Sequence, residues 1–417
     1  MSGSTENFLT VRVPWVLGKD GRWIENACVV WDLSQGVVVD VNRGKSSFCK
    51  GNVLDFDGRA IIPGLVNAHT HLELSALSGL YRNIPSGDYI TWVRELTLRR
   101  SALSWEEIKK AFVDAAVACV GSGTTIVGDV SNVPLVKISR NIDSRTLPWR
   151  YLFWEWIGFT VSLIKQVFGT MRRPIFGYEG NSWVGQFSIV SHAVYSTSAY
   201  LIKKTKDWCR RRGRVFSIHV GENEGERRLI EKGQGPWKEF LEELGKWDDE
   251  WQPLGVSPIR YLDNLRILDE QTLLVHCVHL SEDEWDIISK RRCMVCLCPR
   301  SNHELGVGNI SPVEILKRRI PFLLGTDSLA SSPSLNVFEE AVFLLEHFSI
   351  FDPHLVLKAM TGEGHRFFMK SKAPFVEVGF KGRVLAVNIS PGIPAGELSE
   401  EVIYNGLKGA FSWIPAQ

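Results

Sequence analysis

Short apolar runs recur along most of this chain, and most are followed by a segment whose apolar residues have helical spacing. Eight runs stand out, at residues 61–67, 124–130, 151–159, 187–192, 215–220, 272–278, 293–298 and 321–326. Residues 105–120 and 335–348 show the helical pattern, with charged side chains between the apolar ones. Eight β-then-α units of this kind predict an α/β fold, a (β/α)8 TIM barrel.

The two ends of the chain have a different pattern. Before residue 60, short β-like runs such as 28–33 and 36–41 alternate with Gly and Asp turns, and the stretch from about residue 376 resumes this character. Because chain ends often lie close together, we expect these segments to pair into a small accessory β-sandwich. The predicted domains are residues 1–60 plus 371–417 for the sandwich and 61–370 for the barrel.

The composition is that of an ordinary globular protein, with 44% hydrophobic and 23% charged residues among 417. A net charge of +1 offers no basic field for nucleic acid or for an anionic membrane. The expected partner is therefore a small-molecule substrate, and a homodimer is left open. The most apolar window, 151–168, is interrupted by Glu155 and Lys165, so no membrane span is expected. The first residues lack a secretory pattern, which predicts a cytoplasmic protein.

The eight cysteines are spread too thinly for a disulfide framework. Cys293, Cys296 and Cys298 are close enough in sequence to suggest zinc ligands. They alternate, however, with apolar residues in a run typical of a buried strand. We therefore expect them to be core residues.

Two histidines end the first predicted strand. In an extended strand alternate side chains share a face, so His69 and His71 would project toward the same point while Thr70 faces away. Two imidazoles that converge at a strand end make half of a metal site.

Further ionisable residues fall at the same ends of the predicted strands, where barrel enzymes gather their catalytic groups. They are His192, His219, Glu222, His276 and Asp327. Each one alone is more often structural, as a hydrogen-bonded histidine or a helix N-cap. Their joint placement on one rim favours an active site. Three imidazoles and one carboxylate suit a divalent ion such as zinc or iron, which activates water and so predicts a hydrolytic reaction.

Five motifs together resemble the amidohydrolase superfamily, over nearly the whole chain. They lie at residues 63–73, 219–222, 276–280, 298–302 and 325–328. Within the superfamily they are similar to the mononuclear aminohydrolases, which include cytosine, guanine and adenosine-type deaminases and chlorohydrolases. Members with two metals place a modified lysine on the fourth strand, where this chain has Ser191 and His192. The resemblance therefore implies one divalent ion, zinc or iron.

The resemblance also implies roles for the matching residues. The metal ligands would be His69, His71, His219 and Asp327. Asp327 would in addition accept a proton from the metal's water, and Glu222 would pass that proton to a ring nitrogen as general acid. His276 would polarise or orient the hydroxide.

A narrower resemblance is to aminodeoxyfutalosine deaminases, which remove the 6-amino group of an adenine nucleoside in the alternative menaquinone route. It rests on residues 73–75, 87–93 and 191–196, and on a long insertion between the fifth and sixth strands. This insertion holds Trp237, Phe240 and Trp247, and such loops often form lids over substrates. The expected substrate contacts are His192, Trp92, Glu73, Ser301 and Asn302.

The predicted function is thus a metal-dependent hydrolytic deaminase of a 6-aminopurine nucleoside or similar aminated heterocycle, foremost aminodeoxyfutalosine. Two alternatives stay open. One is a chlorohydrolase or other C–N hydrolase of a triazine-like, guanine or cytosine-type ring, since Glu222 is compatible with that chemistry too. The other is a non-catalytic scaffold on the same barrel, although such relatives typically lose the metal ligands that this chain retains.

Overall fold

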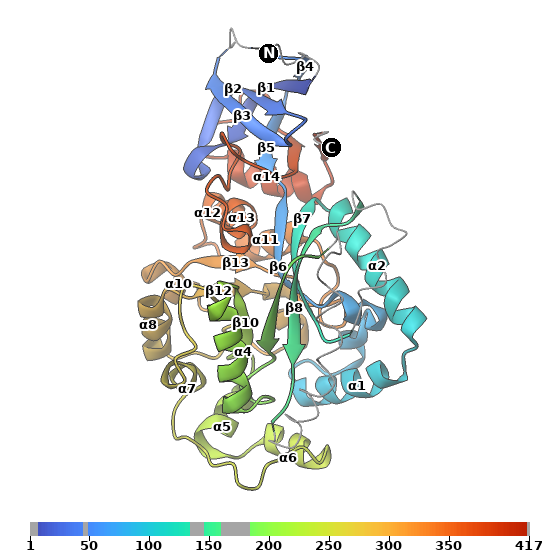
Figure 1. The fold of residues 1–417 in the computed structure, drawn as a ribbon, viewed down its shortest axis with the longest axis vertical. Helices are drawn as coiled ribbons and strands as arrows, with labels where there is room; N and C mark the ends of the chain where they lie inside the picture. The colour runs from blue at the N-terminus through green and yellow to red at the C-terminus, as the bar shows by residue number, and fades with distance from the viewer. Residues whose placement is uncertain (1–6, 45–48, 134–145, 160–183, 415–417) are drawn as a thin grey trace. The chain divides into compact units, whose positions relative to one another are not determined.

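The computed structural model describes residues 7–44, 49–133, 146–159 and 184–414 (Figure 1). The chain divides into two compact units. One comprises Met1–Asn67, Cys119–Ile126 and Asn336–Gln417, and the other Ala68–Ala118 and Val127–Leu335. Residues 160–168 of the apolar window 151–168 lie outside the described residues. Within the described ranges, no helix has the length and apolar character needed to cross a membrane.

The first unit is built around one seven-stranded sheet with the order β15-β14-β5-β1-β2-β3, in which β4 also pairs with β1. The strands are β1 (Phe8–Leu17), β2 (Trp23–Asp32), β3 (Val37–Arg43), β4 (Asn52–Asp55), β5 (Arg59–Pro63), β14 (Val384–Asn388) and β15 (Phe411–Trp413). Strand β14 runs antiparallel to β5, with Ala386 opposite Ile61, so segments from both ends of the chain share the sheet.

The predicted β-sandwich is not confirmed, because these seven strands join a single sheet. The predicted boundaries, 1–60 plus 371–417 against 61–370, stay predictions. Alternate side chains of the paired strands form an apolar core, which includes the fully buried Val11, Val29 and Val38. The helices of this unit are α11 (Val337–His347), α12 (Pro353–Ala359), α13 (Gly362–Met369) and α14 (Leu398–Leu407).

Eight further strands form two four-stranded sheets, β6-β7-β8-β9 and β10-β11-β12-β13. They are β6 (Leu65–Thr70), β7 (Thr124–Ser131), β8 (Trp149–Trp156), β9 (Val184–Ser191), β10 (Phe216–Val220), β11 (Thr272–His276), β12 (Met294–Leu297) and β13 (Phe322–Leu324). Each falls on or beside one of the eight predicted runs. Cys293, Cys296 and Cys298, at β12, are completely buried, as expected of core residues.

The first predicted strand is the exception, because residues 61–67 divide between two strands. Ile61 and Ile62 belong to β5 of the terminal sheet, and β6 begins only after Gly64. A Cβ at Gly64 would lie 2.2 Å from Cγ2 of Thr125, so only glycine permits this close approach. In the sequence, the only sign that this apolar run divides between two strands is Gly64 itself.

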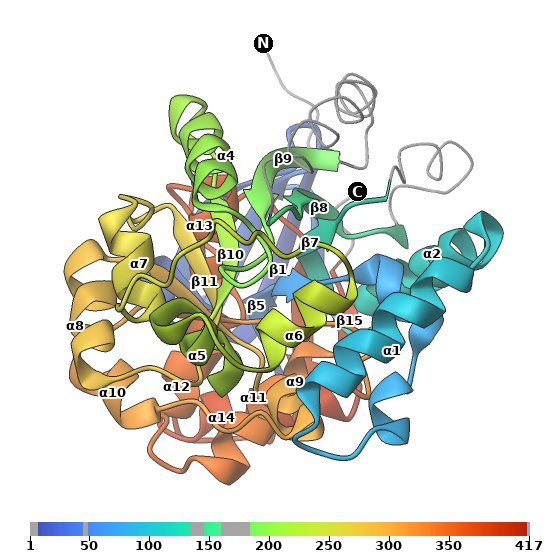
Figure 2. The ribbon, with the colours of Figure 1, turned by 90° about the horizontal axis from the view of Figure 1, so that it is seen from below.

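Neighbouring strands from β10 to β13 pair in parallel, as do β8 and β9. Isolated parallel bridges pair Ala193, just after β9, with His219 of β10, and Asp327, just after β13, with Thr70 of β6. Helices lie between these strands along the chain, and Figure 2 shows α4, α7 and α8 around the outside of β10 and β11. The fold is therefore α/β.

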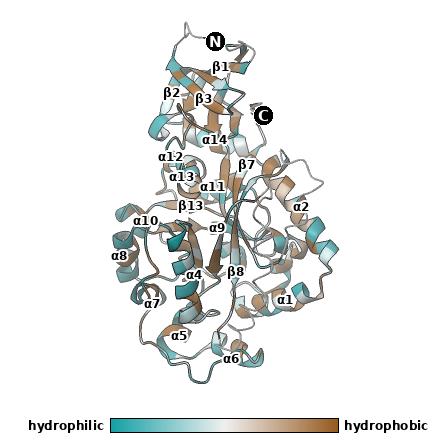
Figure 3. Cartoon of the chain, in the orientation of Figure 1, coloured by the Kyte–Doolittle hydropathy of each residue, from teal (hydrophilic) through white to brown (hydrophobic). Residues whose placement is uncertain are grey.

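The helices that follow these strands are α1 (Tyr89–Ala102), α2 (Trp105–Gly121), α4 (Ala199–Arg211), α5 (Glu224–Lys232), α6 (Pro236–Glu243), α7 (Pro258–Asn264), α8 (Glu282–Arg291), α9 (Pro299–Leu305) and α10 (Pro312–Lys317). Figure 3 shows that much of α4 and α8 consists of hydrophilic residues. Side chains define where several helices begin. Ser281 and Glu284 form a capping box at α8, and Asp88 accepts a hydrogen bond from the backbone N–H of Thr91 at α1.

Candidate active site

The end of β6 carries His69 and His71, whose ring centroids are 4.9 Å apart. The backbone N–H groups of Thr326 and Asp327 both donate to the His69 carbonyl at 3.1 Å. In return, Thr70 Oγ1 donates to the Asp327 carbonyl at 2.7 Å. These bonds attach the segment after β13 to the end of β6, so the carboxylate and the two imidazoles meet.

The other histidines reach the same point from β10 and β11. His219 Nε2 lies 3.2 Å from His69 Nε2. Asp327 Oδ1 lies 3.6 Å from His69 Nε2 and 3.7 Å from His71 Nε2. His276 joins the cluster, because one ligand atom from each of His69, His219 and His276 falls within 4.8 Å of the others. The structure thus brings together all four residues predicted to hold a metal.

The protonation states of His71, His219 and Asp327 would allow these side chains to bind a cation. His219 Nδ1 donates to the His192 carbonyl at 2.9 Å, which leaves the Nε2 lone pair facing His69. Burial, and then the neighbouring imidazoles, lower the pKa of His71 and of His219 well below the usual value, so both are neutral. Burial acts to raise the pKa of Asp327, but contact with His69 and the other imidazoles holds it well below its usual range. The neutral imidazoles of His71 and His219, with the ionised carboxylate of Asp327, suit zinc or iron.

Asp327 is held in place by groups that do not face the cavity. Ser301 Oγ and Ser331 Oγ donate to its Oδ2 at 2.7 and 2.6 Å, so Oδ1 is the oxygen left for the histidines. Its backbone is left-handed, with φ of 56°, and His276 likewise has φ of 74°. Such conformations cost free energy in residues other than glycine, and they concentrate at functional sites.

Glu222 follows β10 and lies beside this cluster. Tyr89 Oη donates to Glu222 Oε2 at 2.5 Å, and Glu222 Oε1 is 3.4 Å from His276 Nε2. Burial, and then the charge of Asp327, raise the pKa of Glu222 well above its usual value, although the Tyr89 hydrogen bond opposes this. Glu222 therefore keeps its proton to a higher pH than an ordinary glutamate does, and can act as a proton donor.

His276 is oriented by Asn302. Its Nδ1 is 2.9 Å from Asn302 Oδ1 and donates to it, so Nε2 is the nitrogen turned toward Glu222. Burial lowers the pKa of His276 to about 4, which keeps the ring neutral. A neutral imidazole with a free lone pair can accept a hydrogen bond from a water or from a protonated carboxyl.

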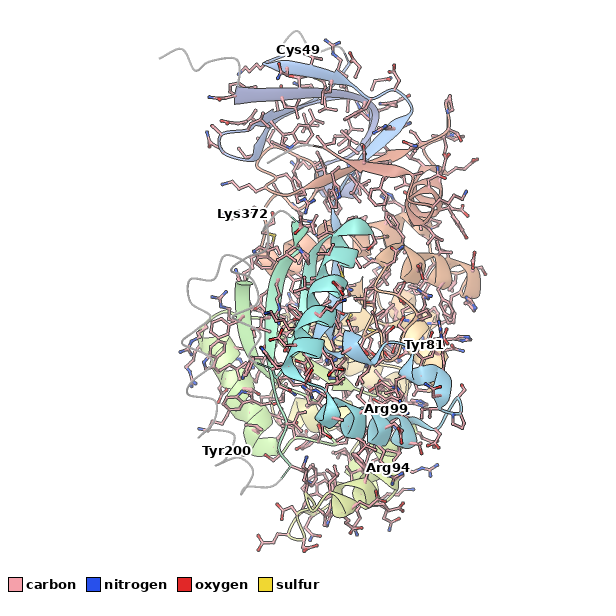
Figure 4. All side chains as sticks on the ribbon, turned by 90° about the vertical axis from the view of Figure 1, so that its right-hand side faces the viewer. Cys49, Tyr81, Arg94, Arg99, Tyr200 and Lys372 are labelled. Atoms are coloured by element: carbon pink, nitrogen blue, oxygen red, sulfur yellow. The ribbon has the colours of Figure 1, made fainter. Side chains whose placement is uncertain are left out.

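A cavity of about 610 Å³ opens onto these groups, within the usual range of small-molecule sites. It is lined by His71, His219, Glu222, His276 and Asp327 and by side chains of α1 and α6, among them Tyr89, Trp92, Trp237 and Phe240. Arg94 of α1, labelled with Arg99 in Figure 4, pairs with Glu243 of α6 at 2.7 Å. This ion pair joins the two helices that border the cavity.

The predicted lid residues lie where the insertion between β10 and β11 meets this cavity. Trp237 stacks on Tyr195 with ring centroids 3.8 Å apart, and Phe240 also lines the cavity. Trp247 stacks on Phe159 with centroids 5.5 Å apart. The insertion therefore supplies an aromatic part of the cavity wall.

Three of the five predicted substrate contacts line the cavity, namely His192, Trp92 and Glu73. The indole N–H of Trp92 already donates to the Ala330 carbonyl at 3.1 Å, so its ring face is the part left for a ligand. The Glu73 carboxylate is engaged by Arg100 and by the Ser131 hydroxyl.

Ser301 and Asn302 are placed differently from the prediction. Neither is among the described residues that line the cavity, because their side chains bind Asp327 and His276 from behind. They belong to α9, whose first turn follows β12. Sequence position alone placed them on the correct rim but could not tell which way they point.

Sequence reasoning assigned no role to Tyr89 or Glu155, both of which line the cavity. Tyr89 belongs to the stretch 87–93 that supported the narrower resemblance, and its position at the start of α1, after the N-cap Asp88, was a usable signal. Glu155 gave a second signal, as a charged residue within a strongly apolar strand.

The chain belongs to the amidohydrolase family, whose family model matches residues 60–392. This membership, together with the buried histidine and aspartate cluster, confirms the prediction of a metal-dependent hydrolase.

Among known proteins, the chain is 28% identical over 341 residues to an aminodeoxyfutalosine deaminase of Deinococcus radiodurans, covering 77% of this chain and 76% of that one. It is 25% identical over 349 residues to a 5-methylthioadenosine/S-adenosylhomocysteine deaminase of Thermoanaerobacter pseudethanolicus, covering 81% and 75%. These relatives support the prediction that the enzyme is of the deaminase type.

Two solved structures share the fold. Helicobacter pylori aminofutalosine deaminase in complex with methylthio-coformycin has a TM-score of 0.80 at 18% identity, covering 95% of this chain and 96% of that one. An adenosine deaminase of Xanthomonas campestris with bound zinc has a TM-score of 0.78 at 18% identity, covering 98% and 91%. At this identity the likeness establishes the fold alone.

Proposed function

We propose that this chain is a hydrolytic deaminase of 6-aminopurine nucleosides that uses one divalent ion. The ion's ligands would be His69, His71, His219 and Asp327. The observation that carries the proposal is Glu222, a buried carboxyl with a strongly raised pKa that faces the same cavity as these ligands. Deamination of a purine needs such an acid, because the ring nitrogen must gain a proton when water attacks the neighbouring carbon. Zinc bound in the similar Xanthomonas campestris structure supports zinc over iron.

We also propose that the eight strands β6 to β13 close into a (β/α)8 barrel. The bridges Ala193–His219 and Thr70–Asp327 join the two four-stranded sheets at both of their edges. The site residues would then share the C-terminal rim, which is where barrel enzymes carry their chemistry.

The first step is activation of water. When bound, a divalent ion lowers the pKa of water from about 15.7 toward about 7 and thereby supplies a nucleophile at neutral pH. Asp327 is ionised and accepts the proton that this water gives up. His276 is neutral and fixed through Nδ1 by Asn302, so its Nε2 can accept a hydrogen bond that orients the water toward the ring carbon.

Glu222 acts in the second step. In its protonated form it donates to the ring nitrogen beside the amino-bearing carbon, while the water oxygen bonds to that carbon. The proton held by Asp327 then passes to the amino group, the C–N bond breaks and ammonia leaves. The hydroxyl on the ring carbon gives its proton to Glu222 as it becomes the carbonyl oxygen, so Glu222 regains the proton that it donated. Tyr89 holds Oε2 of Glu222, so Oε1 keeps its position near His276 throughout.

The finer proposal is that the nucleoside is aminodeoxyfutalosine, which would place the enzyme in menaquinone biosynthesis. The names of the Deinococcus radiodurans relative and of the Helicobacter pylori structure support it. The Thermoanaerobacter pseudethanolicus relative makes 5-methylthioadenosine the main rival. A cytoplasmic location and a homodimer stay predictions.

The test is a substrate panel. Purified, zinc-loaded protein is incubated with aminodeoxyfutalosine, 5-methylthioadenosine, adenosine, guanine, cytosine and a chlorinated triazine, and both ammonia release and the ultraviolet change from adenine to hypoxanthine are followed. We expect ammonia from the adenine nucleosides, with aminodeoxyfutalosine turned over fastest. Chloride release from the triazine without ammonia from any nucleoside would reject the deaminase and favour the chlorohydrolase.

A further inference from the structure

One carboxyl in the cavity has no part in the mechanism above. Glu155 lies near the end of β8, is 5% exposed and lines the cavity. Its Oε1 is buried and has no hydrogen-bond partner among the residues that the structure describes. Burying an unpaired polar oxygen costs free energy, and native proteins rarely leave one without a reason. A ligand that supplies the missing partner would explain why this group is kept.

The nearby cation does not supply that partner. The guanidinium of Arg100 is engaged with Glu73 and with the Asn132 side chain. Burial, and then the charge of Glu73, raise the pKa of Glu155 to about 8, while Arg100 opposes the shift. A buried carboxyl of this kind in a cavity is typical of a binding group rather than of a structural ion pair.

His192 lies beside Glu155 on the same cavity wall. One ligand atom from each of Glu155, His192 and His219 falls within 4.8 Å of the others. His192 Nδ1 is hydrogen-bonded to Ser196 Oγ at 2.6 Å, which leaves Nε2 available to the cavity. The wall therefore offers a carboxyl and an imidazole side by side.

A second metal ion is a poor occupant for this group. His219 Nδ1 donates to the His192 carbonyl, and its Nε2 faces His69 Nε2 at 3.2 Å. His219 thus has no lone pair left for another cation. Glu155 and His192 alone would give an ion only two protein ligands, fewer than such sites usually have.

We propose that Glu155 and His192 together bind a hydroxyl group of the substrate. This inference rests on the proposed function, by which the hydroxyl belongs to the sugar of the nucleoside. A hydroxyl both donates and accepts, so it complements a carboxyl and an imidazole whichever of the two carries a proton. The other unsubstituted ring nitrogens of the purine only accept hydrogen bonds, so they cannot both donate and accept as a hydroxyl does.

The experiment compares an adenine nucleoside with its 2′-deoxy and 3′-deoxy analogues. For the wild type we expect kcat/KM to be about 10-fold or more lower for at least one analogue, because the site's polar groups lose their partner. Glu155→Leu should raise KM for the parent nucleoside by roughly 10- to 100-fold with a smaller change in kcat, and should lose the preference for the hydroxyl. Glu155→Gln should keep that preference, because an amide also donates and accepts.

Controls separate binding from folding and from metal binding. Glu106→Gln changes a glutamate of α2 whose side chain is 79% exposed, and should leave both constants unchanged. Zinc content and melting temperature are measured for each variant. If Glu155→Leu does not fold, Glu155→Asp replaces it, since the shorter side chain retracts the carboxyl and should also lose the preference.

Three results would overturn the inference. They are equal use of both deoxy analogues by the wild type, an equal loss on all three substrates in Glu155→Leu, and loss of zinc in that variant. Failure of the proposed function looks different, because the zinc-loaded wild type would then turn over no nucleoside. In that case the hydroxyl contact is tested by calorimetry, which measures the affinity of the wild type for the parent nucleoside and for its two analogues. Weaker binding of at least one analogue would support the contact, and equal affinities would reject it.

Discussion

The terminal sheet and the cavity region bury opposite kinds of residue. In the sheet, most of the fully buried positions of β1, β2 and β3 are apolar, as at Val11, Val29 and Val38, although Thr10 is a polar exception. Each apolar side chain stabilises the fold through the surface it removes from water. In the cavity region, histidines and carboxyls are buried with shifted pKa values, and two of them have left-handed backbones. These features cost stability. The contrast therefore identifies the cavity region as the part of the molecule where function, rather than packing, determines which residues are buried.

Burial also acts differently on two carboxyls within the cavity. Burial, and then the charge of Asp327, raise the pKa of Glu222, so it keeps its proton to a higher pH than an ordinary glutamate. Asp327 faces imidazoles and accepts two serine hydroxyls, so it stays ionised. One site thus holds an acid and a base at the same pH, because neighbours rather than residue type set the two pKa values.

The largest effect should come from removing a metal ligand. His69→Ala should lose the bound ion and lower kcat by about 1,000-fold or more, because metal activation of water supplies several kcal/mol of the barrier reduction. Zinc per chain and ammonia release measure the two losses. His347→Ala, an exposed histidine of α11, is the matched control and should retain both. A His69→Ala protein that still binds one zinc would show that the site lies elsewhere.

Glu222→Gln should separate the acid from the metal. The amide keeps the shape of the side chain but has no acidic proton, so kcat should fall about 100-fold while the metal content is unchanged. Steady-state kinetics and metal analysis measure this. Full activity in the variant would refute the role of Glu222 as general acid.

Tyr89→Phe should change activity less and move its pH dependence. The Tyr89 hydroxyl lowers the pKa of Glu222, so its removal should raise that pKa further. Since the general acid works only while protonated, activity is lost as pH rises through this pKa, and the alkaline limb of kcat should shift to higher pH. Loss of one hydrogen bond of about 1.4 kcal/mol should also lower kcat by about 10-fold. An alkaline limb that moves down would contradict the assignment.

The terminal sheet should respond in the opposite way. Val29→Ala removes buried methyl groups and should lower the free energy of unfolding by about 2 kcal/mol, with kcat per bound zinc unchanged. Val53→Ala, at a position 39% exposed on β4, should change stability by less than about 0.5 kcal/mol. Denaturant midpoints and kinetics measure both. A fall in kcat for Val29→Ala would contradict the proposal that the terminal sheet contributes to stability and not to catalysis.

Much of the architecture could be predicted from the sequence, because it depends on local periodicity. All eight apolar runs correspond to strands, and the residues at their ends converge as expected from a shared rim. The first run was harder to assign to its strands, since its division at Gly64 depends on the close approach of Thr125 from another part of the chain. The predicted sandwich is not confirmed, and the single sheet of the terminal strands was not predicted, because strand pairing between distant segments leaves no local pattern.

Side-chain direction limited the prediction of the site. Ser301 and Asn302 follow a strand end but point behind the cavity, toward Asp327 and His276. The link from Tyr89 to Glu222 joins residues 133 positions apart, and no spacing rule identifies it. Partners of this kind are set by tertiary packing, which a single sequence does not display.

The most direct test of the central claim is anomalous X-ray scattering at the zinc edge from crystals of the zinc-loaded protein. The account predicts one strong peak per chain, within bonding distance of His69, His71, His219 and Asp327. A peak between Glu155 and His192 instead, or no peak among the four groups at full zinc occupancy in solution, would contradict it.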